Sequence, residues 1–97
     1  MSLPAAPTNY VAEVDIQNVI LTWVNGDGAV KVIHEYAAVT GPDTSWHFQE
    51  DSDVPETTIE KSLPAPDTQY YLRAKSRNAD GDSDYTPVIQ VTTGNYN

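Results

Sequence analysis

The feature that most constrains the fold is a series of short runs rich in β-branched and aromatic residues. Seven such runs recur at a spacing of about ten residues, and Gly, Pro, Asn and Asp stand between them. The 3.6-residue periodicity of amphipathic helices is hard to find. The sequence therefore predicts an all-β chain, a seven-stranded antiparallel β-sandwich.

The expected strands follow from these runs and from the turn residues that bound them. A Pro-rich lead-in suits a chain that joins a sheet at its edge. The 30–39 run has apolar residues on both faces, so its register stays open, and a bulge would reconcile the two sets. The strands are expected at 10–14, 19–24, 30–39, 45–49, 57–61, 69–78 and 88–93, with an acidic loop at 50–56.

Alternation within the clearest runs selects the core. Successive side chains of a strand point to opposite faces, which places Leu21 and Trp23 together on one side of the 19–24 strand. The same rule separates Tyr70 and Leu72 from the basic residues of the 69–78 strand. The predicted core comprises Leu21, Trp23, Tyr70, Leu72, Ile89 and Val91.

The 97 residues predict one domain. We expect residues 1–6 to form a lead-in, 7–93 the domain and 94–97 a tail or linker. The chain has no cysteine, so packing and hydrogen bonds must stabilise it without disulfides. It also lacks the run of roughly 18 apolar residues that a membrane-spanning helix needs, so membrane insertion is not expected.

Several motifs together resemble those of fibronectin type III domains. Leu21-Thr22-Trp23 ends a strand where that family keeps a buried Trp, and the stretch 66–70 (Pro-Asp-Thr-Gln-Tyr) is similar to its Pro-x-Thr-x-Tyr motif. The alternation from Tyr70 to Ser83 follows its strand F and FG loop. The resemblance covers the whole chain and implies an immunoglobulin-like β-sandwich, with Tyr70 as the tyrosine of a tyrosine corner. One extra residue between Leu63 and Pro66 departs from the family pattern.

The charge balance excludes some partners. Fourteen acidic residues against five basic ones give a formal net charge of −9. A polyphosphate backbone or an anionic bilayer would be repelled at long range, so nucleic acid is not an expected partner.

The resemblance implies that three acidic loops share one end of the sandwich. Such an end could steer a basic partner or hold a divalent cation weakly, or its charge could simply prevent association. The run 80–84 begins like a calcium loop, but Tyr85 and Val91 stand where an EF-hand needs Gly and Glu, so no metal site and no cofactor are expected. The candidate binding residues are Asn25, Asp27, Asp51, Asp53, Asp80, Asp82 and Asp84.

Other polar residues offer less. Arg73, Lys75 and Arg77 form a basic stripe on one strand face, which either reads a carboxylate-bearing or glycan-bearing surface or pairs with acids of neighbouring strands. The two histidines, His34 and His47, have no nucleophile or zinc motif beside them, and a lone strand histidine is typically at the surface or partly buried. Catalysis is therefore not expected.

These observations predict a non-catalytic, extracellular spacer or recognition module of a larger bacterial or phage-encoded protein. The expected partners are neighbouring domains and a protein or carbohydrate surface such as a host cell envelope. An alternative is a structural domain on the exterior of a phage tail or virion. A more distant alternative is a hydrolase that uses the loop carboxylates.

Overall fold

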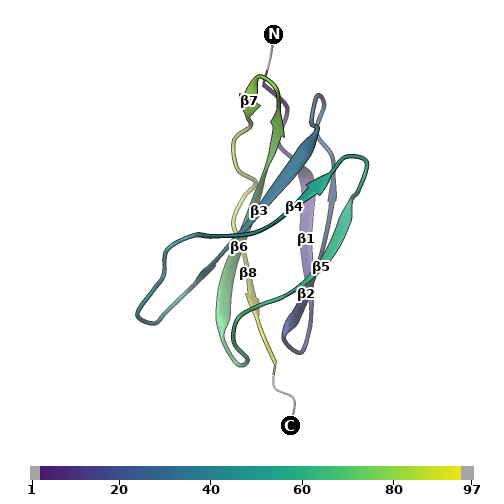
Figure 1. The fold of residues 1–97 in the computed structure, drawn as a ribbon. Helices are drawn as coiled ribbons and strands as arrows, with labels where there is room; N and C mark the ends of the chain where they lie inside the picture. Colours follow the sequence, from purple (N-terminus) through teal and green to yellow (C-terminus); the bar gives the residue numbers. More distant parts are fainter. Residues whose placement is uncertain (1–2, 95–97) are drawn as a thin grey trace.

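The computed structural model describes residues 3–94, and every regular element in this range is a β-strand. The strands form two antiparallel sheets (Figure 1): a three-stranded sheet in the order β1-β2-β5, and a five-stranded sheet in the order β4-β3-β6-β7, in which β8 also pairs with β6. The strands are β1 (Thr8–Asp15), β2 (Asn18–Val24), β3 (Lys31–Ala38), β4 (His47–Asp53), β5 (Thr58–Ser62), β6 (Gln69–Asn78), β7 (Gly81–Asp82) and β8 (Ile89–Thr92).

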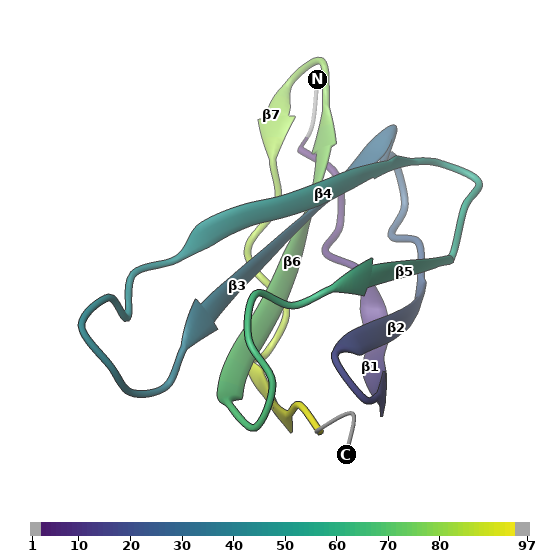
Figure 2. The same ribbon diagram turned by 60° about the horizontal axis from the view of Figure 1, so that its bottom comes forward.

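The predicted all-β antiparallel sandwich is confirmed, with one strand more than expected. The eighth is β7, a two-residue strand that extends the hairpin after β6 through the pairs Arg77 with Asp82 and Asn78 with Gly81. Gly81 has a φ of 135°, a conformation that side chains other than glycine's rarely allow. Loop 39–46, between β3 and β4, projects from the body of the sandwich (Figure 2).

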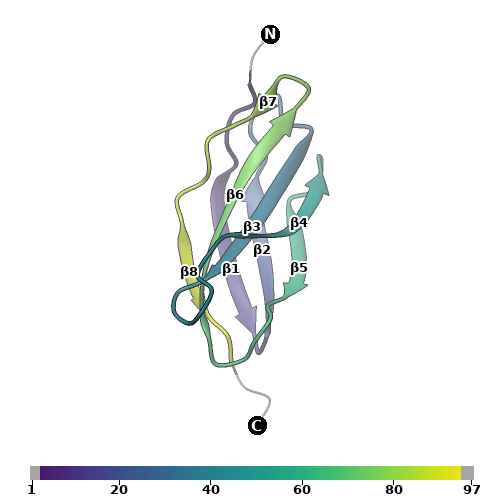
Figure 3. The ribbon, with the colours of Figure 1, turned by 60° about the vertical axis from the view of Figure 1, so that its left-hand side comes forward.

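The molecule is elongated, with principal extents of 50 × 25 × 17 Å. The two sheets lie face to face, and the first described residues lie beside β7 while β8 ends at the opposite pole (Figures 1 and 3). Residues 1–2 of the expected lead-in and 95–97 of the expected tail lie outside the described residues. The described part of the chain contains no helix long and apolar enough to cross a bilayer.

The core lies between the sheets. Leu21 and Trp23 of β2 are buried, as are Tyr70 and Leu72 of β6, while Thr22 on the other face of β2 is exposed. The predicted inward residues of β8, Ile89 and Val91, are only partly buried and pack against this core. The Tyr70 hydroxyl bond of a tyrosine corner remains a prediction.

Strand β3 is buried on both faces, which explains its ambiguous pattern. Val32 and His34 face the core and are fully buried, while Ile33 and Ala37 on the outward face are 5% and 2% exposed. Outward side chains of β4 and β6 therefore cover β3. A bulge does exist, but on the partner strand: Glu50 lies opposite His34 and Phe48 opposite Glu35, which leaves Gln49 as the extra residue of β4.

The predicted acidic loop at 50–56 is wrong over its first half. β4 continues to Asp53, so Asp51 and Asp53 belong to a strand, where they lie opposite Ile33 and Lys31. Acidic residues are rare in strands, but hydrogen bonding to β3 and the positive charge of Lys31 offset that local preference.

Candidate binding surfaces

The Asn25 side chain stabilises the loop that contains it. Its side-chain oxygen accepts a hydrogen bond of 2.8 Å from Trp23 Nε1, and its amide nitrogen donates one of 3.1 Å to the Glu56 carbonyl. The residue therefore caps the buried indole and ties the turn after β2 to the turn before β5. This role is internal to the fold.

Two acids of β4, Asp51 and Asp53, are paired with the same lysine. Lys31 Nζ lies 2.6 Å from Asp53 Oδ1 and 3.9 Å from Asp51 Oδ2. The hydrogen bond and charge of Asp53 raise the pKa of Lys31. Asp51 and Asp53 thus lie on the outward sheet face and away from the loops to which the sequence assigned them.

Asp82 is also paired internally. Arg77 Nε lies 2.6 Å from Asp82 Oδ1, and Lys75 Nζ lies 3.0 Å from Asp82 Oδ2. Hydrogen bonds from Arg77 and Lys75 hold the Asp82 pKa well below its usual range. Together with the 2.8 Å contact of Arg73 with Glu35, these contacts confirm the pairing interpretation of the basic stripe.

The remaining loop acids, Asp27, Asp80 and Asp84, have exposed side chains. The Ala5 amide donates a 2.9 Å hydrogen bond to the Asp27 carbonyl. A Cβ atom on Gly26 would lie 2.1 Å from the Ala5 carbonyl oxygen, and one on Gly81 would lie 2.9 Å from Leu3 Cδ2. The lead-in therefore packs closely on the turns after β2 and β6, and covers part of the acidic loop end.

Metal binding finds no support at this end. Within residues 3–94, no group of three acidic or histidine side chains is arranged to hold a metal ion.

A second surface lies on the outward face of the five-stranded sheet, around Arg73 of the basic stripe, where the sequence did not indicate that Trp46 and Tyr85 would contact it. The Arg73 guanidinium is held between two rings, 4.0 Å from the Trp46 ring centroid and 3.7 Å from that of Tyr85. Arg73 Nε and Nη2 both lie 2.8 Å from Glu35 Oε1, and the Tyr85 hydroxyl donates to Glu35 Oε2 at 3.2 Å. Arg73 is thus fixed in place.

Exposed apolar side chains surround this stack. Register places Phe48 opposite Glu35 and Glu35 opposite Arg73, so Phe48 shares the outward face. Phe48 is 61% exposed, Val88 50% and Tyr85 37%. Tyr71 stands two residues before Arg73 on the same face of β6. We call this surface the aromatic face: Trp46, Phe48, Tyr71, Arg73, Tyr85 and Val88.

The ion pairs of the outward sheet face balance one another in charge. The face carries four of the five basic residues, and the acids that they contact also number four. The ten other acids and Lys61 therefore account for the entire net charge of −9. The basic residues of the face are Lys31, Arg73, Lys75 and Arg77, and their acidic partners are Glu35, Asp51, Asp53 and Asp82.

His34 occupies the centre of the core, although the sequence suggested a more exposed position. Its Nδ1 lies 3.0 Å from the Tyr10 hydroxyl and its Nε2 3.2 Å from Ser52 Oγ, and its ring centroid is 4.7 Å from that of Trp23. Burial lowers the pKa of His34 to about 4 and raises the pKa of Tyr10. A neutral imidazole with both nitrogens engaged suits a structural role.

A smaller polar cluster lies at the start of β4. The Asp43 carboxylate accepts hydrogen bonds from the Ser45 amide and hydroxyl, and lies 2.9 Å from His47 Nε2. The Ser45 bonds, followed by His47, lower the Asp43 pKa to about 2. Because the Ser45 hydroxyl donates to Asp43 and the cluster is exposed, this is not the arrangement of an activated nucleophile.

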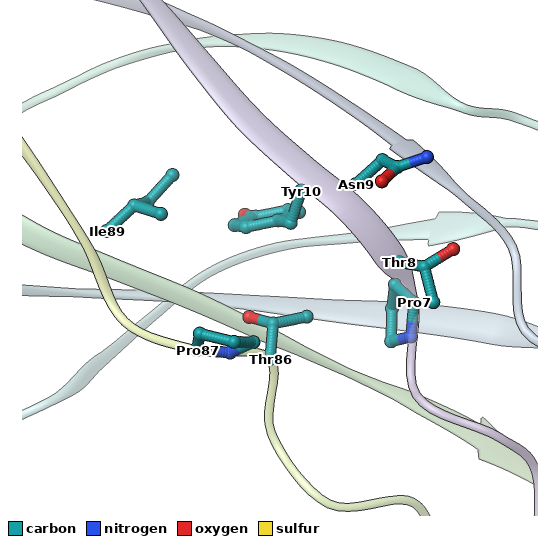
Figure 4. A pocket seen from close by; sticks show the side chains of 7 residues that line it. All are labelled: Pro7, Thr8, Asn9, Tyr10, Thr86, Pro87 and Ile89. Atoms are coloured by element: carbon teal, nitrogen blue, oxygen red, sulfur yellow. The ribbon is translucent and has the colours of Figure 1, made fainter.

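A pocket of about 370 Å³ opens between the start of β1 and the segment before β8 (Figure 4). The Tyr10 ring points from β1 toward Ile89, and its hydroxyl is the group bound to His34. The lining contains no carboxylate, so the pocket offers no acid pair for a hydrolase. The lining residues are Pro7, Thr8, Asn9, Tyr10, Thr86, Pro87 and Ile89.

Comparison with solved structures decides the fold. The human contactin 1 fn3 domain matches with a TM-score of 0.85 and 18% identity, over 100% of this chain and 84% of that one. A structure named FN3tt matches with a TM-score of 0.81 and 20% identity, over 97% and 98% of the two chains. The chain has the fibronectin type III fold. No family model and no curated protein matches the sequence.

The fibronectin type III fold confirms the architecture expected from the motifs. This fold is typically non-catalytic. The same fold also forms part of longer chains: the chain matches 17% of a structure of the twitchin kinase region from C. elegans, with 21% identity, 96% of this chain covered and a TM-score of 0.83.

Proposed function

We propose that this chain is a non-catalytic spacer module that holds neighbouring parts of a larger protein in line. The observation that carries the proposal is the position of the two ends of the described chain at opposite poles of a body 50 Å long (Figure 3). A module with its ends at opposite poles adds its full length to the separation of its neighbours.

The acidic loop end is proposed as the joint with the preceding domain. The lead-in packs on the turns after β2 and β6, so a domain attached there would approach Asp27, Asp80 and Asp84 first. Of the seven candidate binding residues, these three have exposed side chains in loops. Asn25, Asp51, Asp53 and Asp82 form hydrogen bonds or ion pairs within the module. We take residues 7–93 as the domain and the flanking residues as linkers.

Composition supports a bacterial or phage-encoded parent that works outside the cell. The chain has no cysteine, no Asn-x-Ser/Thr glycosylation site and a strong negative charge. On a phage tail or virion, the same module would act as an exterior structural domain. That role shares the rigid sandwich but needs no second domain in line with it.

The test is small-angle X-ray scattering of two copies joined in tandem through residues 1–6 and 94–97. We expect a maximum dimension of about 100 Å, twice the length of one module. The control tandem carries a Gly-Ser linker of equal length, and we expect a broader distribution of distances because that linker does not pack on the turns. The proposal would be contradicted if the tandem joined through residues 1–6 and 94–97 folds back side by side, with a maximum dimension near that of one module.

A further inference from the structure

The aromatic face runs across the five-stranded sheet from the edge strand β4 to the segment before β8. Phe48, Tyr85 and Val88 are all more than one-third exposed, and they come from β4 and from the segment before β8. Arg73 of β6 links the two sides because it contacts Trp46 and Tyr85 at once. Contiguous exposed apolar patches on small domains mark interaction sites.

Charge narrows the choice of partner. The ion pairs of the outward sheet face cancel, while the rest of the molecule carries the net charge of −9. A polyanion would gain no attraction at this face and would be repelled by the surrounding acids. A second copy of the chain would bring a second charge of −9 close to the first. An uncharged partner would not be repelled by the acids around the face.

The chemistry of the face suits a sugar ring. A pyranose has an apolar side of C–H bonds, which packs on aromatic rings because the ring face is negative and the hydrogens are slightly positive. Its equatorial hydroxyls pair well with planar charged groups. Glu35 contacts two guanidinium nitrogens of Arg73, and a guanidinium carries five N–H groups, so donors remain on a side chain that is 21% exposed.

We propose that the aromatic face binds an uncharged polysaccharide built of hexopyranose units. Phe48 and Tyr71 supply ring surface for the apolar side of the sugar, and Arg73 donates to adjacent hydroxyls. Because Trp46, Tyr85 and Glu35 already hold Arg73, little side-chain entropy is lost on binding. This activity is additional to the spacer role and does not depend on it.

The test is affinity electrophoresis in native gels at pH 8, where the charge of the protein drives its migration. The gels contain hydroxyethylcellulose, glucomannan or galactomannan, and an alginate gel serves as the anionic control. We expect at least one neutral polymer to slow the wild-type protein, and alginate not to slow it. Phe48→Ala should weaken the apparent Kd about tenfold, since it removes the most exposed ring of the face.

Val11→Ala is the matched control, because Val11 is 57% exposed on β1, in the other sheet. It should bind like the wild type. Arg73→Lys keeps the charge but loses the planar donors, and should weaken binding several-fold. Urea unfolding of each variant establishes that it is folded, and Phe48→Ala should unfold close to the wild type.

Three results would overturn the proposal. Absence of retardation in every neutral gel would show that the face has no affinity for such polymers. Equal retardation of wild type and Phe48→Ala would place any binding elsewhere. A dimer in sedimentation equilibrium that Phe48→Ala abolishes would identify a second copy of the chain as the occupant.

Discussion

His34 and Arg73 lie on opposite faces of the five-stranded sheet, and each basic side chain contacts two aromatic rings. His34 meets Tyr10 and Trp23 between the sheets, where it is fully buried. Arg73 meets Trp46 and Tyr85 on the outward face, and its side chain is 21% exposed. The inner group is uncharged at neutral pH, whereas the outer one is a cation.

The two groups differ in chemistry as well as in place, because a guanidinium stays protonated in proteins whereas a buried imidazole is held neutral. The inner imidazole has only hydroxyl partners within hydrogen-bond distance, and burial lowers its pKa to about 4. The outer guanidinium is paired with Glu35 at 2.8 Å, and its side chain is 21% exposed. We call His34 with Tyr10 and Trp23 the inner cluster, and Arg73 with Trp46 and Tyr85 the outer cluster. We expect the inner cluster to govern stability and the outer cluster to govern recognition.

The largest effect on stability should come from removing the Trp23 ring, which packs on His34 between the sheets. Trp23 is 2% exposed, so Trp23→Ala should lower the free energy of unfolding by about 3–5 kcal/mol, through lost burial and an unfilled cavity. Trp46→Ala on the outward face should cost only about 1–2 kcal/mol, because that ring is partly exposed. Urea unfolding followed by circular dichroism measures both. Equal losses would remove the distinction between the two clusters.

Acid should weaken the inner cluster next. The pKa of His34 is about 4 in the folded protein against 6.5 ordinarily, so between these values the unfolded chain binds a proton that the folded one does not. The stabilisation is complete above pH 6.5 and is lost as the pH falls toward 4, by about 3 kcal/mol in total. The measurement is the free energy of unfolding in urea at pH 7.5, 6.5, 5.5 and 4.5.

The control for this pH dependence is His34→Gln, which keeps a polar side chain but does not titrate. Glu50 is the carboxylate whose charge acts on His34, and it opposes the shift. Because the carboxylates are common to both proteins, the difference between the two curves isolates His34. If the wild type and the variant lose stability with the same slope, the buried imidazole is not the acid-sensitive group.

The smallest expected effect is the coupling free energy between Arg73 and the Trp46 ring on the outward face. A double-mutant cycle on Arg73→Ala and Trp46→Ala should give a coupling of about 0.5–1 kcal/mol, the size of a partly exposed cation–π contact. The matched cycle pairs Trp46→Ala with Arg77→Ala, since Arg77 lies four residues further along β6 and contacts Asp82. That coupling should be close to zero. Similar values in the two cycles would mean that the ring contact contributes nothing specific.

Part of this structure was predictable because strand geometry is local. Alternation on β2 and β6 selected Leu21, Trp23, Tyr70 and Leu72 correctly, since successive residues of any strand point to opposite faces. The basic stripe on β6 followed from the same rule. The acidic segment of β4 was assigned wrongly, because its charge suggested a loop while its partner Lys31 lies on another strand.

The sequence by itself determined the periodic pattern of the strands, the turns between them, the absence of cysteine and the charge of −9. The tertiary structure decided which acids are neutralised, that His34 is buried, and that Trp46, Arg73 and Tyr85 form one stack. The physical reason is that alternation acts between adjacent residues. Ion pairing, ring stacking and desolvation instead depend on the register and packing of strands far apart in the chain.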